Sequence, residues 1–86
     1  MIEQQRVKDL ASRFASDTIE IRRHIHAHPE LSYKEFETAK FVASKLKEMG
    51  LEIQEGVAGT GVVTLIQGKN PEKLVVALRG DMDALP

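Results

Sequence analysis

Two aspartates near the end of the chain are the residues best suited to chemistry. Asp81 and Asp83 follow the apolar run at residues 74–78, after Arg79 and Gly80. Open α/β sheets bind ligands beyond the carboxyl ends of their strands, which is where this pair would lie. Residues two apart in an extended segment project to the same side, so both carboxylates can face one cation or one ligand nitrogen. The pair repels itself unless a cation, a proton or a donor compensates it, so we expect it to form part of a site.

The same spacing has a second interpretation. In a solvated loop, Asp81 would cap a turn or a following helix, because a short carboxylate side chain readily accepts hydrogen bonds from nearby backbone N–H groups. The residue pattern alone leaves this alternative open.

Three alternating histidines, His24, His26 and His28, do not predict a metal site. Residues two apart on a helix face about 200° apart, so only His24 and His28 could share a face. Pro29 places the end of the helix near His28, so we expect these side chains to cap the C-terminal end of the helix or to pack in the loop that follows. Glu30 is expected to bind backbone amides or an arginine near the same turn.

A further glycine motif has a structural interpretation. Gly59 and Gly61 have the G-x-G spacing of a dinucleotide-binding loop, but the sequence that follows them is typical of a strand rather than a helix. The pattern therefore predicts a tight or flexible turn.

Composition and charge exclude several classes of partner. The formal net charge is −1 and aromatic residues make up 5% of the chain, so we expect neither nucleic acid nor acidic lipid as a partner. No apolar run approaches the length that spans a membrane, and the first residues lack the apolar core of a secretory signal. The chain has no cysteine, which is compatible with a reducing compartment. We therefore expect a cytoplasmic protein.

The first half of the chain is typical of two helices. Apolar residues recur at three- and four-residue steps from Val7 to Ile25, which places them on one helical face. This helix is predicted to end by His26 or Ala27, before Pro29.

The second helix carries local signals at both ends. Ser32 and Glu35 have the spacing of a capping box, and Leu31 and Phe36 occupy the two positions of a hydrophobic staple. Gly50 is placed where a left-handed C-terminal cap is expected.

The second half of the chain predicts three strands, at residues 51–54, 62–66 and 74–78. The short link at residues 68–72 predicts an antiparallel hairpin between the second and third strands. The third strand is apolar throughout, which is typical of a strand buried on both faces. Two helices and two other strands give such a strand little cover, so we expect an α-α-β-β-β segment from the start of a larger α/β domain.

Two stretches of the chain carry a resemblance to a known family. They are His28-Pro29-Glu30-Leu31-Ser32, with Glu35 and Thr38, and Val76-Ala77-Leu78-Arg79-Gly80-Asp81-Met82-Asp83-Ala84-Leu85-Pro86. Together they resemble the N-terminal part of the zinc-type amidohydrolases, which include hippurate hydrolases, N-acyl-amino-acid amidohydrolases and aminoacylase-like carboxypeptidases. The resemblance extends from about residue 19 to residue 86.

The resemblance implies a three-layer α/β metallohydrolase catalytic domain, of which residues 1–86 are the incomplete N-terminal part. A smaller inserted domain, which often dimerises, and the remainder of the catalytic domain would lie outside this chain. Two divalent cations per subunit are implied, with zinc, manganese, cobalt and nickel not distinguished. Their ligands would come from Cys, His and Glu motifs outside residues 1–86, so we expect no metal ligand within the chain.

The resemblance also implies roles for the two aspartates. The wider metallopeptidase group has a His-x-Asp motif at this place, in which the His binds metal and the Asp orients it. Asp81 matches the His position and Asp83 matches the Asp position. Asp83 is thus expected to orient a ligating imidazole, whereas Asp81 departs from the wider pattern.

The implied reaction is hydrolysis of the amide bond of a hippurate-like N-acyl-amino acid or a dipeptide, which yields an amino acid and a carboxylic acid. The full-length enzyme is expected to be a homodimer or larger homo-oligomer, and the 86-residue chain alone is expected to be inactive.

Two alternatives come from other functional classes. One is a magnesium-dependent phosphotransferase with Asp81 as nucleophile, although Arg79 and Gly80 separate Asp81 from the apolar run. The other is a non-catalytic interaction module whose exposed sheet edge receives a strand from a partner.

Overall fold

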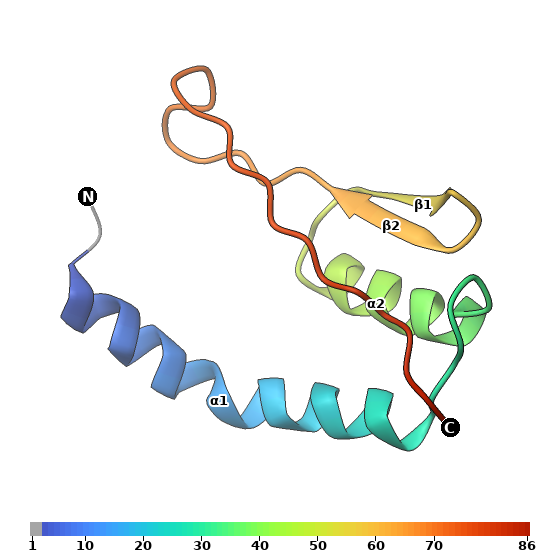
Figure 1. Ribbon diagram of the computed structural model, residues 1–86. Helices are drawn as coiled ribbons and strands as arrows, with labels where there is room; N and C mark the ends of the chain where they lie inside the picture. Colours follow the sequence, from blue (N-terminus) through green and yellow to red (C-terminus); the bar gives the residue numbers. More distant parts are fainter. Residues whose placement is uncertain (1–2) are drawn as a thin grey trace.

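A computed structural model describes residues 3–86 as two helices, a β-hairpin and a long irregular segment (Figure 1). The elements are α1 (Gln4–Ala27), α2 (Phe36–Glu48), β1 (Ile53–Val57) and β2 (Gly61–Thr64). Two helices and a two-stranded antiparallel sheet confirm the predicted α/β class at this level. No helix in the described part of the chain is long and apolar enough to cross a membrane.

Helix α1 ends where the sequence predicts, at Ala27. The backbone N–H of His28 donates to the carbonyl of Ile25 at 3.2 Å and closes the last turn. No residue of α1 is fully buried, and the first half of the helix extends away from the hairpin (Figure 1). Only its C-terminal end, around the half-buried Ile25, contributes to the surface described below.

The C-terminal cap of α2 is confirmed. Gly50 has φ +82°, a left-handed conformation that glycine adopts without steric cost. The N–H of Leu51 donates to the carbonyl of Leu46 at 3.2 Å, and that of Gly50 donates to the carbonyl of Lys47 at 2.9 Å. These two bonds form a Schellman motif, which satisfies carbonyls that the helix end leaves unpaired.

The predicted capping box at the other end of α2 is wrong. The residue that precedes the helix is Glu35, not Ser32, and its side chain makes no capping hydrogen bond. The helix therefore begins three positions later than the capping box requires, and Leu31 and Phe36 do not occupy the two positions of a staple. Both of these apolar side chains are exposed.

The hairpin joins β1 to β2, which corresponds to the first and second predicted strands. Its register pairs Ile53 with Thr64 and Val57 with Gly61, with an irregularity between residues 54 and 57. The predicted tight turn is confirmed at residues 58–60, where Ala58 and Gly59 both have positive φ. The prediction that the hairpin joins the second and third strands is wrong. The turn at residues 58–60, between the first and second strands, is shorter than the link at residues 68–72 and has the positive φ angles that tight hairpin turns require.

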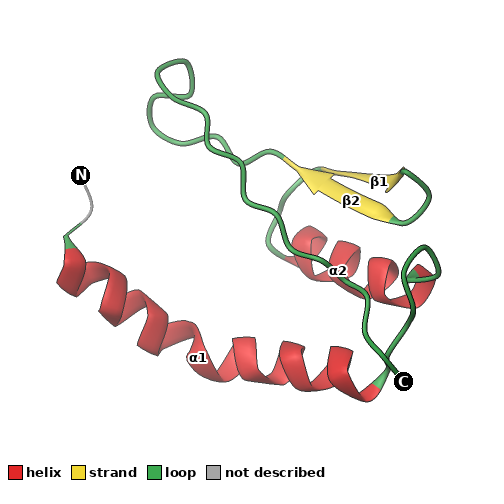
Figure 2. Ribbon diagram, in the orientation of Figure 1, coloured by secondary structure: helices red, strands yellow, loops and turns green. Residues whose placement is uncertain are grey.

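The third predicted strand does not form. Residues 65–86 contain no helix or strand and follow β2 as a long irregular segment (Figure 2), in which residues 74–78 are exposed. A strand needs a neighbour for its backbone N–H and C=O groups, and no strand in residues 3–86 offers one. The expectation of burial on both faces is wrong for the same reason, since Leu78 is 96% exposed.

The packed part of the molecule is small and lies between α2 and the hairpin. Ala43 of α2 is its buried apolar residue, and Thr38 and Thr60 are buried polar residues. The hairpin covers one side of α2, and the last residues return to the loop after α1 (Figure 1). Polar contacts between this loop, at residues 28–35, and the last residues therefore hold Asp83 in place.

Candidate functional site

The carboxylate of Asp83 is tied to the loop between α1 and α2. The hydroxyl of Ser32 donates a hydrogen bond to Asp83 Oδ2 at 2.7 Å, across 51 positions of sequence. The backbone N–H of the next residue, Ala84, donates to the carbonyl of Glu30 at 2.8 Å. One contact thus fixes the main chain beside Asp83, and the other fixes its side chain.

A tight turn presents Ser32 to Asp83. The N–H of Lys34 donates to the carbonyl of Leu31 at 3.0 Å and closes the turn around Ser32 and Tyr33. Tyr33 has φ +67°, a left-handed conformation that costs a non-glycine residue about 1–2 kcal/mol. Tyr33 is 82% exposed, so its own packing does not compensate this cost. Contacts made by neighbouring residues of the loop therefore have to stabilise this conformation of Tyr33.

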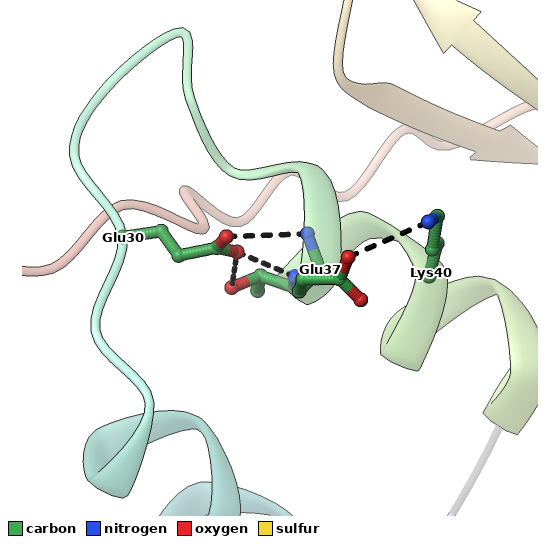
Figure 3. Close-up of polar contacts among 4 residues, drawn as sticks. Glu30, Glu37 and Lys40 are labelled. Atoms are coloured by element: carbon green, nitrogen blue, oxygen red, sulfur yellow. Dashed lines mark hydrogen bonds and ion pairs between the residues drawn. The ribbon is translucent and has the colours of Figure 1, made fainter.

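Glu30 supplies one of those contacts, at the start of α2. Figure 3 shows its carboxylate facing the first turn of the helix. The amide of Glu37 donates to Oε2 at 3.2 Å, while the amide and the hydroxyl of Thr38 both donate to Oε1 at 2.6 Å. A carboxylate at this end is also favoured by the helix dipole. The prediction that Glu30 binds backbone amides is confirmed.

These contacts change the acidity of Glu30. The hydroxyl of Thr38, followed by its amide, holds the pKa of Glu30 below its ordinary value of 4.5, because both bonds favour the ionised form. Desolvation acts in the opposite direction, and the amide of Glu37 adds a smaller lowering effect. Glu30 is thus a charged cap of α2 at neutral pH.

Glu35 ties the same loop to the hairpin. The hydroxyl of Thr60, which is buried in the turn between β1 and β2, donates to Glu35 Oε1 at 3.1 Å. Carboxylates and a hydroxyl at residues 30–35 thus contact α2, the hairpin and the C-terminal segment. We call residues 30–35 the anchoring loop.

A groove of about 830 Å³ lies beside the anchoring loop. Its walls come from the end of α1, the loop, the hairpin and the C-terminal segment. Asp81 and Asp83 both line it, together with Ser32, Glu35 and Thr60. The structure thus brings both predicted aspartates to one concave surface, although each has a different partner.

Asp81 pairs with the arginine that precedes it. Arg79 Nη2 lies 3.0 Å from Asp81 Oδ1, and the two side chains are 90% and 71% exposed. Solvent screens such a pair, so it contributes little to stability. It does offset the negative charge beside Asp83.

The residues present do not make a metal site by themselves. No group of three or more His, Cys, Asp or Glu side chains within residues 3–86 could hold a metal ion. Asp81 is engaged with Arg79, and Asp83 with Ser32. No chemical step through a metal can therefore be derived from these residues.

The histidines contribute to the end of α1. His28 Nδ1 lies 2.8 Å from the carbonyl oxygen of His24, which matches the expected capping role. The His24 ring stacks on Phe41 of α2 with centroids 4.0 Å apart. This contact packs the end of α1 against α2.

The contacts of three residues of the site, Ser32, Thr38 and Thr60, were not predicted from the sequence, although Ser32 and Thr38 belong to the motif stretches. Ser32 matches a local capping pattern, so the sequence predicts a bond to the start of α2 instead of its bond to Asp83. The hydroxyls of Thr38 and Thr60 bind Glu30 and Glu35 only once α2 and the hairpin are assembled.

Comparison with known proteins identifies similar sequences among hydrolases. The thermostable carboxypeptidase 2 of Saccharolobus solfataricus is 58% identical over 69 residues, which are 79% of this chain and 17% of that protein. The hippurate hydrolase of Campylobacter jejuni is 52% identical over 66 residues, 77% of this chain and 17% of that enzyme. The N-acyl-L-amino acid amidohydrolase of Geobacillus stearothermophilus is 45% identical over 83 residues, 95% of this chain and 22% of that enzyme.

This chain is similar to the N-terminal part of these hydrolases. The resemblance predicted from its two motif stretches is confirmed. The chain spans about a fifth of the length of the curated relatives that it matches. No family model matches it, and no solved structure does.

Proposed function

We propose that this chain is the N-terminal part of the catalytic domain of a longer hydrolase, called the full-length protein below. Its reaction adds water across the amide bond of an N-acyl-amino acid or a dipeptide and releases an amino acid and a carboxylic acid. The observation that carries this proposal is the 45–58% identity to enzymes named as hippurate hydrolase, amidohydrolase and carboxypeptidase. The phosphotransferase and the interaction module are not favoured, because these relatives are hydrolases.

Asp83 is the residue of this chain that we assign to the active centre. Ser32 is its side-chain partner within residues 3–86, and it binds Oδ2, so Oδ1 remains open to a group from outside the described chain. A carboxylate with one oxygen held in this way can orient an imidazole through the other. Asp81 and Arg79 lie at the rim of the same groove and set its local charge.

The remaining parts of the proposal concern the longer protein. It includes two divalent metal ions per subunit, with ligands outside residues 1–86 and with zinc, manganese, cobalt and nickel as candidates. A larger three-layer α/β domain, a cytoplasmic location and a homodimeric or larger assembly belong to the same proposal. Small-molecule amides are the proposed substrates.

Substitution Asp83→Asn in the full-length protein tests the proposal. Wild-type protein should release free amino acid from hippurate or an N-acetyl-amino acid, and a chelator should abolish the release. The substitution keeps the shape of the side chain but removes its charge, so kcat/KM should fall about 10- to 100-fold. Activity and metal content are measured on the same samples, the latter by atomic emission.

Asp17→Asn on the exposed side of α1 is the matched control and should change neither quantity. Asp83 has no role in the active centre if Asp83→Asn leaves both activity and metal content unchanged. Failure of well-folded wild-type protein to hydrolyse any N-acyl-amino acid or dipeptide would contradict the proposed reaction itself.

A further inference from the structure

We propose that Ser32 is a positioning residue, whose hydroxyl sets the orientation of the Asp83 carboxylate during turnover. The inference rests on the proposed function, because the role of Asp83 belongs to it. Ser32 belongs to the first motif stretch, but neither the resemblance nor the names of the relatives assign it a task.

The contact has the geometry of a strong hydrogen bond. The 2.7 Å distance between Ser32 Oγ and Asp83 Oδ2 lies in the range of hydroxyl-to-carboxylate bonds, which are stronger than bonds between neutral groups. The neighbouring bond from the Ala84 amide to the Glu30 carbonyl holds the main chain and leaves rotation of the Asp83 side chain free. Ser32 restricts that rotation.

The hydroxyl comes from an anchored segment. Glu30 binds the first turn of α2, and Glu35 binds Thr60 of the hairpin turn, so both ends of the anchoring loop are held. Between them, Tyr33 adopts its left-handed conformation at a steric cost. Strained backbone of this kind persists where its surroundings fix it, and it is frequent at functional sites.

Ser32 and Asp83 are both exposed in the described chain, so the bond between them adds little to stability. If the role of Ser32 were purely structural, Ser32→Ala would change neither kcat nor the melting temperature. A positioning role predicts a loss in kcat without a matching loss in folding, which separates the two explanations.

The test compares variants of the full-length protein with an N-acyl-amino acid as substrate. Ser32→Ala should lower kcat about tenfold and leave KM and the melting temperature unchanged. Ser32→Thr keeps the hydroxyl at an exposed position and should restore kcat to within about twofold of wild type. Ser44→Ala, the same change at an exposed position of α2, is the control and should leave kcat unchanged.

A double-mutant cycle with Asp83→Asn shows whether Ser32 acts through Asp83. In that background, Ser32→Ala should change kcat by less than about twofold, because its partner is already impaired. The proposal is overturned if Ser32→Ala keeps full kcat, if Ser32→Thr fails to restore it, or if the loss is equally large beside Asp83→Asn. Where Asp83→Asn has no measurable turnover, the Ala and Thr variants alone decide.

These results are distinct from failure of the proposed function. Absence of amide hydrolysis by wild-type protein overturns both proposals. Full activity of Asp83→Asn removes the role of Asp83, and with it that of Ser32, but leaves the proposed reaction in place. Full kcat of Ser32→Ala in an enzyme that Asp83→Asn disables overturns only the role of Ser32.

Discussion

At the scale of single residues, carboxylates that accept hydrogen bonds hold the candidate site together. Glu30 binds the first turn of α2, Glu35 binds Thr60, and Asp83 binds Ser32. Each bond joins two different segments of the chain. The pKa of Glu30 is lowered by its bonds to Thr38, so its contribution to the order of the anchoring loop can be tested through pH.

Substitution Glu30→Gln should lower the melting temperature of the protein at pH 7 and should make the melting temperature depend less on pH. The pKa of Glu30 is lowered on folding, so its contribution is fully present above the ordinary value of 4.5 and is lost as pH falls through the lower folded value. The melting temperature, followed by circular dichroism, should be lower for Glu30→Gln than for wild type at pH 7. The two proteins should converge in acid, once the pH lies below the lowered pKa of Glu30 and both side chains are neutral.

Glu72→Gln, the same change in an exposed turn, provides the comparison for Glu30→Gln. It should follow wild type at every pH. A difference between Glu30→Gln and wild type that stays constant as the pH falls from 7 into the acid range where carboxylates are protonated would mean that the charge of Glu30 is not what stabilises the loop.

At the scale of elements, the sequence predicts those whose signals are local. Pro29 marks the end of α1, and Gly50 marks the end of α2, because each residue restricts or permits one backbone conformation. The turn at residues 58–60 is signalled by its glycines in the same way. Both helices and two of the three strands therefore follow from short stretches of sequence.

Elements and contacts that depend on distant partners could not be predicted in this way. Residues 74–78 have the composition of a buried strand, but pairing requires a neighbouring strand that residues 3–86 do not supply. Ser32 fits a local capping rule, yet its hydroxyl binds a carboxylate 51 positions away. Asp81 and Asp83 were found from their place after an apolar run, whereas their different partners required the fold.

Substitution Gly50→Ala tests the local cap of α2. An added methyl group would meet no atom within 4 Å, so the only penalty is the left-handed backbone at φ +82°. That penalty is about 1 kcal/mol, which corresponds to a fall of about 4–8 °C in melting temperature for a domain of this size. Gly68→Ala is the matched control, because Gly68 also has open space but not a positive φ. Equal melting temperatures of the two variants would contradict the assignment of the Schellman motif.

At the scale of the whole molecule, much apolar surface of the described residues is left uncovered, and two stretches of the chain carry part of it. The first half of α1 exposes Val7, Leu10 and Phe14, and the irregular segment after β2 exposes residues 74–78. The larger domain of the proposed function would supply cover and strand partners for these surfaces. In the chain by itself, five successive apolar residues without charge form a segment that favours pairing with other chains.

Residues 1–86 on their own are therefore expected to associate, and Val76→Lys should weaken the association. Val76 is 72% exposed at the centre of the segment, where a lysine opposes strand-to-strand pairing by repulsion and by the cost of burying its charge. Sedimentation velocity over a concentration series should show at least about tenfold weaker self-association for Val76→Lys than for wild type. Gln67→Lys adds the same charge outside the apolar run and should associate like wild type. A wild-type chain that stays monomeric up to about 100 μM would show that residues 74–78 are not a pairing surface.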